Sequence, residues 1–246
     1  VFGHQSPDTD STGAPIIWSW YLKEKRGLSA VPKLLGEPNT EALFVLDHWG
    51  FEKPAIINSI NKGDSVIIVD TNNPAELPEG INDADIQGII DHHKLVGGLE
   101  TSGPIDITIR PVACTATIMF DLMGDDVSDM PDPIKGLALS CIISDTLEFR
   151  SPTTTRRDRE VAERLAKDLK IDVSDYASKL FRAKSDVSDF SDAQLLRMDS
   201  KKYPIADLMF RVSVLETTEP DMIFRRKSSL IEAMETVCAE DSVDHV

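Results

Sequence analysis

The sequence predicts an α/β fold, a mostly parallel sheet covered by helices, followed by the start of a smaller α/β second domain. Two observations predict it. Short β-branched runs alternate with segments of helical periodicity. The most apolar run, residues 66–69, has no polar interruption, which is typical of a strand buried in a parallel sheet. The length of 246 residues suits one large domain or one and a half.

The strands expected from this pattern are short and lie in the first half of the chain. They are residues 1–2, 30–34, 55–57, 65–70, 86–91 and 105–109. Because Pro32 has no backbone N–H to donate, the run at 30–34 is at best an edge strand.

Helices are predicted between and after these strands. Ser11 and Thr12 precede Pro15 and are expected to open the first helix, which Gly27 closes. The expected helices are residues 16–25, 40–49, 114–123, 133–144, 156–169, 173–184 and 192–199. After about residue 203, a strand at 210–215 and a helix at 221–240 follow, too little to close a core alone. We therefore expect one complete domain over residues 1–188, and a linker with an incomplete second domain over 189–246.

Composition excludes several classes of protein. The 26 Lys+Arg and 42 Asp+Glu residues give a net charge of −16, which argues against binding along nucleic-acid phosphates. The apolar runs are far shorter than the ~20 residues of a membrane span. Three widely spaced cysteines, Cys114, Cys141 and Cys238, lie in apolar stretches and are expected in the core. No signal peptide is visible, so a cytoplasmic location is expected. Both ends look cut, so a fragment is expected.

Acidic and histidine residues recur where the predicted strands and one further apolar segment end. In open α/β sheets, ligands gather beyond the carboxyl ends of the strands. The candidates are His4, Asp8, Asp10, Asp70, Asp91, His92, His93 and Asp145. Taken singly, Asp8 and Asp10 are equally well explained as helix caps, and Asp70 and Asp145 as turn residues. Converging carboxylates without a cation would repel one another, so convergence would indicate a metal site.

Mixed oxygen and imidazole donors without thiolate suit Mn²⁺, Co²⁺, Fe²⁺ or Zn²⁺. The number of donors suits two ions, and such paired ions turn a bridging water into a nucleophile and clamp phosphoryl oxygens. Four aspartates balance two divalent ions, so an anionic substrate would need further cations, such as added Mg²⁺ and Lys or Arg side chains.

Several motifs together resemble the family II, manganese-dependent inorganic pyrophosphatases of the DHH phosphoesterase superfamily. They are the segments HQSPDTD at residues 4–10, DHH at 91–93, RPVACTAT at 110–117, SDT at 144–146 and SPT at 151–153. The resemblance implies hydrolysis of inorganic diphosphate to two phosphates by a dinuclear metal centre. It also implies two Mn²⁺ (or Co²⁺) per site, Mg²⁺ with the substrate, and a homodimer. Residues 1–188 would be the DHH metal-binding catalytic domain, and 189–246 a linker and incomplete, DHHA2-like substrate-clamping domain.

The resemblance also implies residue roles. The six metal ligands would be His4, Asp8, Asp10, Asp70, His92 and Asp145, with Asp70 shared by both ions. His93 would contact the substrate and help proton transfer, with Asp91 orienting the imidazoles, and Lys201 would bind a phosphate group.

Two departures from the family pattern leave alternatives open. Thr71 stands where many relatives have histidine, and the family's final Ser-Arg-Lys segment is absent; Arg225, Arg226 and Lys227 are interpreted as a solvated helix face instead. The alternatives are a DHH-superfamily phosphodiesterase for short oligonucleotides or cyclic dinucleotides, and a catalytically impaired metal-binding module. The absence of a Gly-Gly-Gly-His-type segment counts against the phosphodiesterase.

Overall fold

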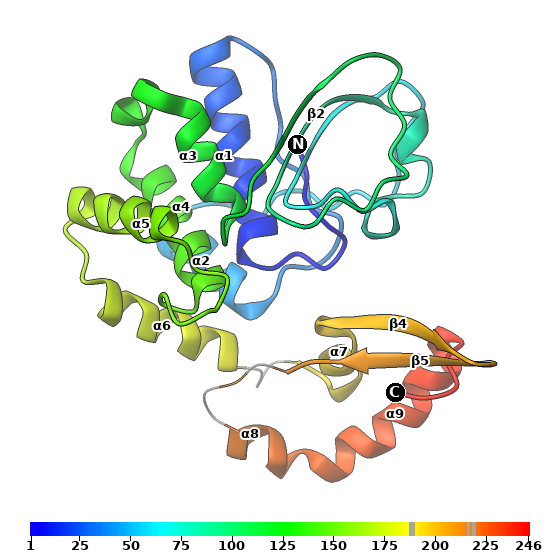
Figure 1. The fold of residues 1–246 in the computed structure, drawn as a ribbon. Helices are drawn as coiled ribbons and strands as arrows, with labels where there is room; N and C mark the ends of the chain where they lie inside the picture. The colour runs from blue at the N-terminus through cyan, green and yellow to red at the C-terminus, as the bar shows by residue number, and fades with distance from the viewer. Residues whose placement is uncertain (187–189, 216, 218–219) are drawn as a thin grey trace. The chain divides into compact units, whose positions relative to one another are not determined.

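The computed structural model describes residues 1–186, 190–215, 217 and 220–246 (Figure 1). The chain divides into two compact units, Val1–Leu180 and Phe181–Val246. Within the described residues, no helix combines the length and apolar character that crossing a lipid bilayer requires. The two units are described separately below.

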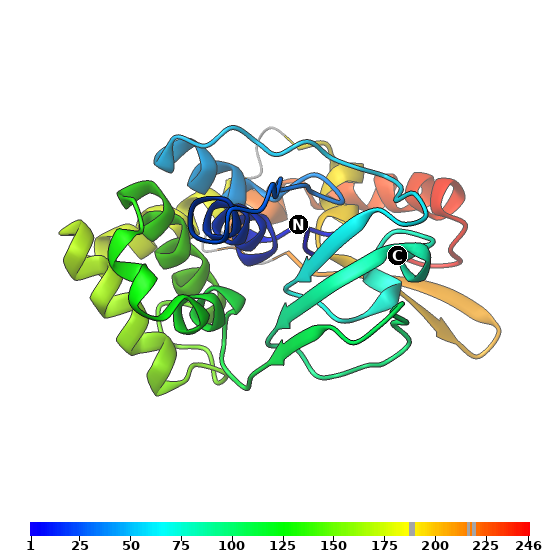
Figure 2. The ribbon, with the colours of Figure 1, turned by 90° about the horizontal axis from the view of Figure 1, so that it is seen from above.

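The first unit contains a parallel sheet of β1 (Ser65–Val69), β2 (Asp85–Asp91) and β3 (Asp106–Ile109), in the order β1-β2-β3. Figure 2 shows the three strands side by side, with the helices α1 to α6 gathered beside them. The short apolar strands β1 and β2 fall where the sequence predicted them, and Ile68, Val69 and Ile86 are buried. The predicted parallel, helix-covered α/β architecture is therefore confirmed.

Three of the predicted strands are reduced to single bridges. Phe2 pairs with Ile68, donating its N–H to the Ile67 carbonyl (3.2 Å) and accepting from the Val69 N–H (3.0 Å). The runs at 30–34 and 55–57 meet only at the Leu34–Ile56 bridge. These predictions of full strands were wrong, since each segment forms a single bridge; in the run at 30–34, Pro32 also lacks a ladder donor.

The first helix, α1 (Thr9–Arg26), begins before Ser11 and Thr12, which were expected to open it. Its N-cap is Asp8, whose Oδ1 accepts from the Ser11 N–H at 2.9 Å, so Ser11 and Thr12 are not the cap and Pro15 lies inside the helix. Because the helix starts this early, Asp10 lies on its first turn and is buried.

The other helices of the first unit match the prediction within two residues. They are α2 (Thr40–Trp49), α3 (Thr115–Met123), α4 (Asp132–Thr146), α5 (Arg156–Leu169) and α6 (Val173–Ser185), with 3₁₀ turns η1 (Pro74–Glu76), η2 (Ile81–Asp83) and η3 (Gly124–Asp129). α4 is buried almost all round and packs against α1 and α5. A Cβ at Gly13 of α1 would lie 2.5 Å from the Cys141 Sγ of α4, so only glycine permits this close approach.

The second unit contains α7 (Asp192–Met198), the antiparallel strands β4 (Ser200–Ile205) and β5 (Leu208–Ser213), α8 (Pro220–Arg225) and α9 (Lys227–Asp241). Strand β4 was not predicted, because its two lysines and its proline hide the alternation. The small core of the second unit consists of Leu195, Leu196, Leu230 and Val237.

The prediction of one helix at 221–240 was wrong. The structure has two helices there, α8 and α9, and Arg226 lies between them. The Arg226 guanidinium lies 2.7 Å from the Asp192 carboxylate and donates to the Phe190 carbonyl at 2.6 Å. The interpretation of residues 225–227 as one solvated helix face was therefore wrong for Arg226, which is half-buried and ion-paired.

Candidate metal centre

The residues predicted to form the site converge at the carboxyl edge of the parallel sheet. His4 and Asp8 follow the Phe2 bridge, Asp70 follows β1, and Asp91 ends β2. Asp145 lies in the last turn of α4, the helix predicted at residues 133–144, so the apolar segment that it ends is helical. The helix brings the carboxylate in from beside the sheet.

One cluster of donor atoms contains His4, Asp8 and Asp70. The His4 Nε2 lies 3.8 Å from Asp8 Oδ2 and 3.6 Å from Asp70 Oδ2. Asp70 has the left-handed backbone conformation (φ 59°), which aspartate tolerates better than most residues. One donor atom from each of the three residues lies within 4.8 Å of the others, close enough to coordinate one cation.

A second cluster lies on the other side of Asp70. The His92 Nε2 is 3.2 Å from Asp70 Oδ1, and donor atoms of Asp10, His92 and Asp145 lie within 4.8 Å of one another. The two oxygens of Asp70 thus face different histidines, one in each cluster. All six predicted ligands are brought together, and one carboxylate stands between the two clusters.

The electrostatics of these carboxylates favour a bound cation. Burial raises the pKa of Asp70 well above its usual value, and the negative charges of Asp10 and Asp8 raise it further. Burial and the same neighbours also raise the pKa of Asp145. The buried oxygens Asp10 Oδ1 and Asp145 Oδ2 have no hydrogen-bond partner among the described residues. Divalent cations would supply both the missing charge and the missing contacts, so this donor set fits a metal centre.

The same negative charges also raise the pKa of His4, although burial opposes them. Burial lowers the pKa of its imidazole, but the hydrogen bond to Asp8 and the charges of Asp8, Asp70 and Glu76 outweigh this and raise it to about 9. Without a metal the ring is protonated at neutral pH, and metal binding would displace that proton.

His93 and Asp91 form a hydrogen-bonded pair beside the clusters, and His93 also has a donor atom within 4.8 Å of donor atoms of Asp70 and His92. The His93 Nδ1 lies 2.9 Å from Asp91 Oδ1, which also accepts from the backbone N–H groups of His92 (2.7 Å) and His93 (3.0 Å). Burial raises the pKa of Asp91, but these hydrogen bonds outweigh it and hold the pKa below its usual value. The bond to Asp91 raises the pKa of His93. The His93 side chain is 53% exposed, so it can reach a bound molecule.

Sequence reasoning missed Thr115, the first residue of α3. Its backbone N–H donates to Asp10 Oδ2 (2.6 Å) and its hydroxyl donates to Asp70 Oδ1 (3.1 Å). One fully buried residue therefore holds carboxylates from two different elements. Its position as the first residue of a helix, where N–H groups lack helical partners, was the available signal.

We expect Thr115→Val, which removes the hydroxyl and keeps the side chain's shape, to weaken metal binding about 10–100-fold. Asp70 loses a hydrogen bond that orients it, whereas the bond to Asp10 remains. Metal titration calorimetry measures the effect, with Thr101→Val, an exposed threonine, as the matched control. Equal affinities in the two variants would contradict this role for Thr115.

The structure also shows where Thr71 and Lys201 lie. The Thr71 hydroxyl, where many relatives have histidine, donates to Glu76 Oε2 at 2.9 Å. Lys201 lies on β4 in the second unit, paired in register with Val212, and its side chain is exposed.

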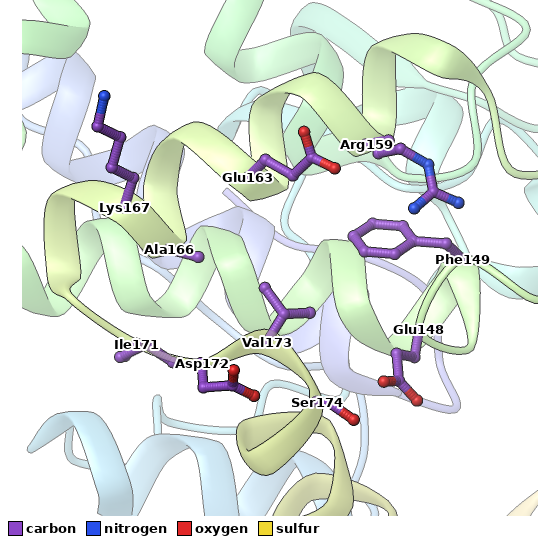
Figure 3. Close-up of a pocket in the computed structure, with 10 residues that line it drawn as sticks. All are labelled: Glu148, Phe149, Arg159, Glu163, Ala166, Lys167, Ile171, Asp172, Val173 and Ser174. Atoms are coloured by element: carbon purple, nitrogen blue, oxygen red, sulfur yellow. The ribbon is translucent and has the colours of Figure 1, made fainter.

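A cavity of about 640 Å³ lies elsewhere in the first unit, at α5 and the start of α6 (Figure 3). Figure 3 shows the Arg159 guanidinium beside the ring of Phe149. The Arg159 Cζ lies 4.3 Å from the centre of that ring. None of the predicted site residues lines this cavity, so the metal clusters and the cavity are separate features.

Comparisons with known proteins agree with this geometry. The DHH family, N-terminal domain, matches residues 1–144, and the DHHA2 domain matches residues 178–246. A protein of Deinococcus radiodurans named "Probable manganese-dependent inorganic pyrophosphatase" is 40% identical over 249 residues, covering 99% of this chain and 78% of that protein. A protein of the same name from Lactobacillus acidophilus is 35% identical over 245 residues, with the same coverage.

A solved structure from Methanococcus jannaschii, described as a candidate family II inorganic pyrophosphatase, matches with a TM-score of 0.84 and 30% identity. The match covers 99% of this chain and 80% of that one. An exopolyphosphatase-related protein of Bacteroides fragilis shares the fold alone, at 16% identity and a TM-score of 0.57. The motifs, the fold and these matches agree: the chain belongs to the family II, manganese-dependent inorganic pyrophosphatases of the DHH superfamily.

Proposed function

We propose that the protein hydrolyses inorganic diphosphate to two phosphates at the carboxyl edge of the parallel sheet. The observation that carries the proposal is the convergence of two donor clusters on the two oxygens of Asp70. Paired clusters of this composition suit two Mn²⁺ (or Co²⁺) ions, with His4 and Asp8 on one side and Asp10, His92 and Asp145 on the other. Bound there, paired divalent ions activate water and neutralise charge on phosphoryl oxygens.

The remaining residues of the site would act on the substrate. His93, whose Nδ1 lies against Asp91, would donate a hydrogen bond to a phosphate oxygen and take part in proton transfer. Lys201 would supply a cation for a phosphate group. Mg²⁺ accompanying the substrate would offset negative charge of the diphosphate, because the four aspartates already balance the two metal ions. Each of these roles adds positive charge or donors where a diphosphate carries oxygens.

The test is a comparison of substrates with the metal-loaded protein. We expect phosphate release from diphosphate with Mn²⁺ and Mg²⁺ to be at least about 100-fold faster, in kcat/KM, than cleavage of a linear or cyclic dinucleotide. Faster dinucleotide cleavage would favour the phosphodiesterase alternative. Metal binding without release of phosphate from either substrate would favour the catalytically impaired module.

A homodimer is part of the same proposal. β3 pairs with β2 on one side within the described part of the chain, and its Ile107 side chain is 55% exposed. Pairing with β3 of a second copy would cover this edge. We expect light scattering to give twice the 27.2 kDa of one chain, and Ile107→Lys to shift the mass toward 27.2 kDa. A wild-type mass of 27.2 kDa at micromolar concentration would contradict the dimer.

We infer the location and the partners of the protein from its cysteines and its net charge. The three cysteines are all free thiols, consistent with a reducing, cytoplasmic setting. The net charge of −16 disfavours nucleic acid as a partner. Diphosphate is the proposed ligand because the relatives are named as inorganic pyrophosphatases.

A further inference from the structure

Asn72 is a buried amide two residues beyond Asp70, with only 3% of its surface exposed. Its Nδ2 donates to Asp91 Oδ2 (2.5 Å) and to the Lys94 carbonyl (3.0 Å), and its Oδ1 accepts from the Val96 N–H (2.8 Å). The three bonds require one orientation of the amide, because both neighbours of Nδ2 are acceptors and the neighbour of Oδ1 is a donor.

The partners of Asp91 are divided between its two oxygens. Oδ1 accepts from the backbone N–H groups of His92 and His93 and lies against the His93 ring, whereas Oδ2 faces Asn72. Asp91 is fully buried, so an unpartnered Oδ2 would be costly. Asn72 thus satisfies the side of the carboxylate that His93 leaves open, and the plane of the carboxylate is held from both sides.

The orientation of Asp91 decides the orientation of His93. A carboxylate at Nδ1 stabilises a hydrogen on Nδ1, so Nε2 accepts a proton when the ring is neutral and donates a hydrogen bond to a phosphate oxygen only when the ring is protonated. We propose that Asn72 is a positioning residue for the hydrolysis: through Asp91 it sets the orientation and tautomer of the His93 ring. This inference rests on the proposed function for its kinetic consequence, whereas its effect on the His93 ring is measured independently.

The test compares Asn72→Ala with the matched control Asn73→Asp. Asn73 caps η1 by accepting from the Ala75 N–H (3.1 Å), a role that aspartate also fills. We expect Asn72→Ala to lower kcat for diphosphate about 10–100-fold with a smaller change in KM, and Asn73→Asp to stay within about twofold of wild type. If Asn72→Ala does not fold, Asn72→Asp replaces it in the test. Aspartate has the same shape as asparagine, but it places an acceptor against Asp91 and so removes the same hydrogen bond.

Two readouts separate positioning from a merely structural effect. In a double-mutant cycle, Asn72→Ala should cost almost nothing in a His93→Gln background, since the residue acts through His93. In ¹⁵N NMR of the protein loaded with diamagnetic Mg²⁺, the His93 ring should change from mainly Nδ1–H in wild type to a mixed tautomer in Asn72→Ala. The spectrum of His93→Gln assigns the signal.

The outcomes are distinguishable. Additive losses in the cycle, or a His93 tautomer unchanged in Asn72→Ala, would overturn the inference and leave the proposed function standing. A wild-type protein that releases no phosphate from diphosphate would overturn the proposed function, and the NMR comparison would still decide whether Asn72 orients His93.

Discussion

Asp70→Asn is expected to lower diphosphate hydrolysis at least about 1,000-fold, which corresponds to about 4 kcal/mol in the barrier. Asp70 is the carboxylate whose two oxygens face the two donor clusters, 3.6 Å from His4 and 3.2 Å from His92. Asparagine has the same shape and is also favoured in the left-handed conformation that residue 70 adopts. The substitution therefore removes the charge shared by both clusters and leaves the backbone undisturbed.

The measurements are phosphate release and the number of Mn²⁺ ions bound at saturation. We expect fewer than two ions per chain in Asp70→Asn, with wild-type values in the control Asp106→Asn, an exposed residue that begins β3. If Asp70→Asn bound two ions with wild-type affinity and turned over diphosphate normally, Asp70 would not join the two clusters.

Removal of metal is expected to have the second large effect, on stability. A ligand at about 1,000 times its Kd stabilises the folded state by about 4 kcal/mol. For a unit of this size that corresponds to a fall in Tm of about 8–16 °C when a chelator removes the ions. Scanning calorimetry before and after chelation, with readdition of Mn²⁺, measures it.

The fall in Tm on removal of the metal ions should be larger at higher pH. The pKa of His4 is raised from 6.5 to about 9, so the stability it contributes without metal is fully present below pH 6.5 and is lost as the pH rises through 9. The raised pKa values of Asp70 and Asp145 act in the same direction, because their buried carboxylates ionise as the pH rises. Bound cations replace these protons, so the Tm of the metal-loaded protein should change less.

The comparison is made at pH 6 and pH 8.5, with and without Mn²⁺. A gap in Tm that is wider at pH 8.5 supports the linkage between protons and metal. A metal-free protein that becomes more stable between these two pH values would contradict it.

Much of the fold could be predicted from the sequence because local signals were strong. The helix at residues 156–169 was predicted with both of its ends, since Thr155 and Asp158 form a capping box that needs no distant partner. The helix at 221–240 was predicted as one, and only the pairing of Arg226 with Asp192 in α7 shows where it breaks. Strand β4 exists because β5 pairs with it, and its own residues carry little strand signal.

The residue types of the site could also be predicted from the sequence, because carboxylates and imidazoles recur at the ends of segments. By itself the sequence determined the donor chemistry, the acidic charge and the run of elements, because these depend on residue identity and short-range periodicity. Only the tertiary structure decided that Asp145 lies beside His92, that Thr115 holds both Asp10 and Asp70, and that Asn72 supports Asp91. These contacts join residues 19 to 105 positions apart, and close packing of distant segments, such as α1 against α4 at Gly13, brings such residues within hydrogen-bonding distance.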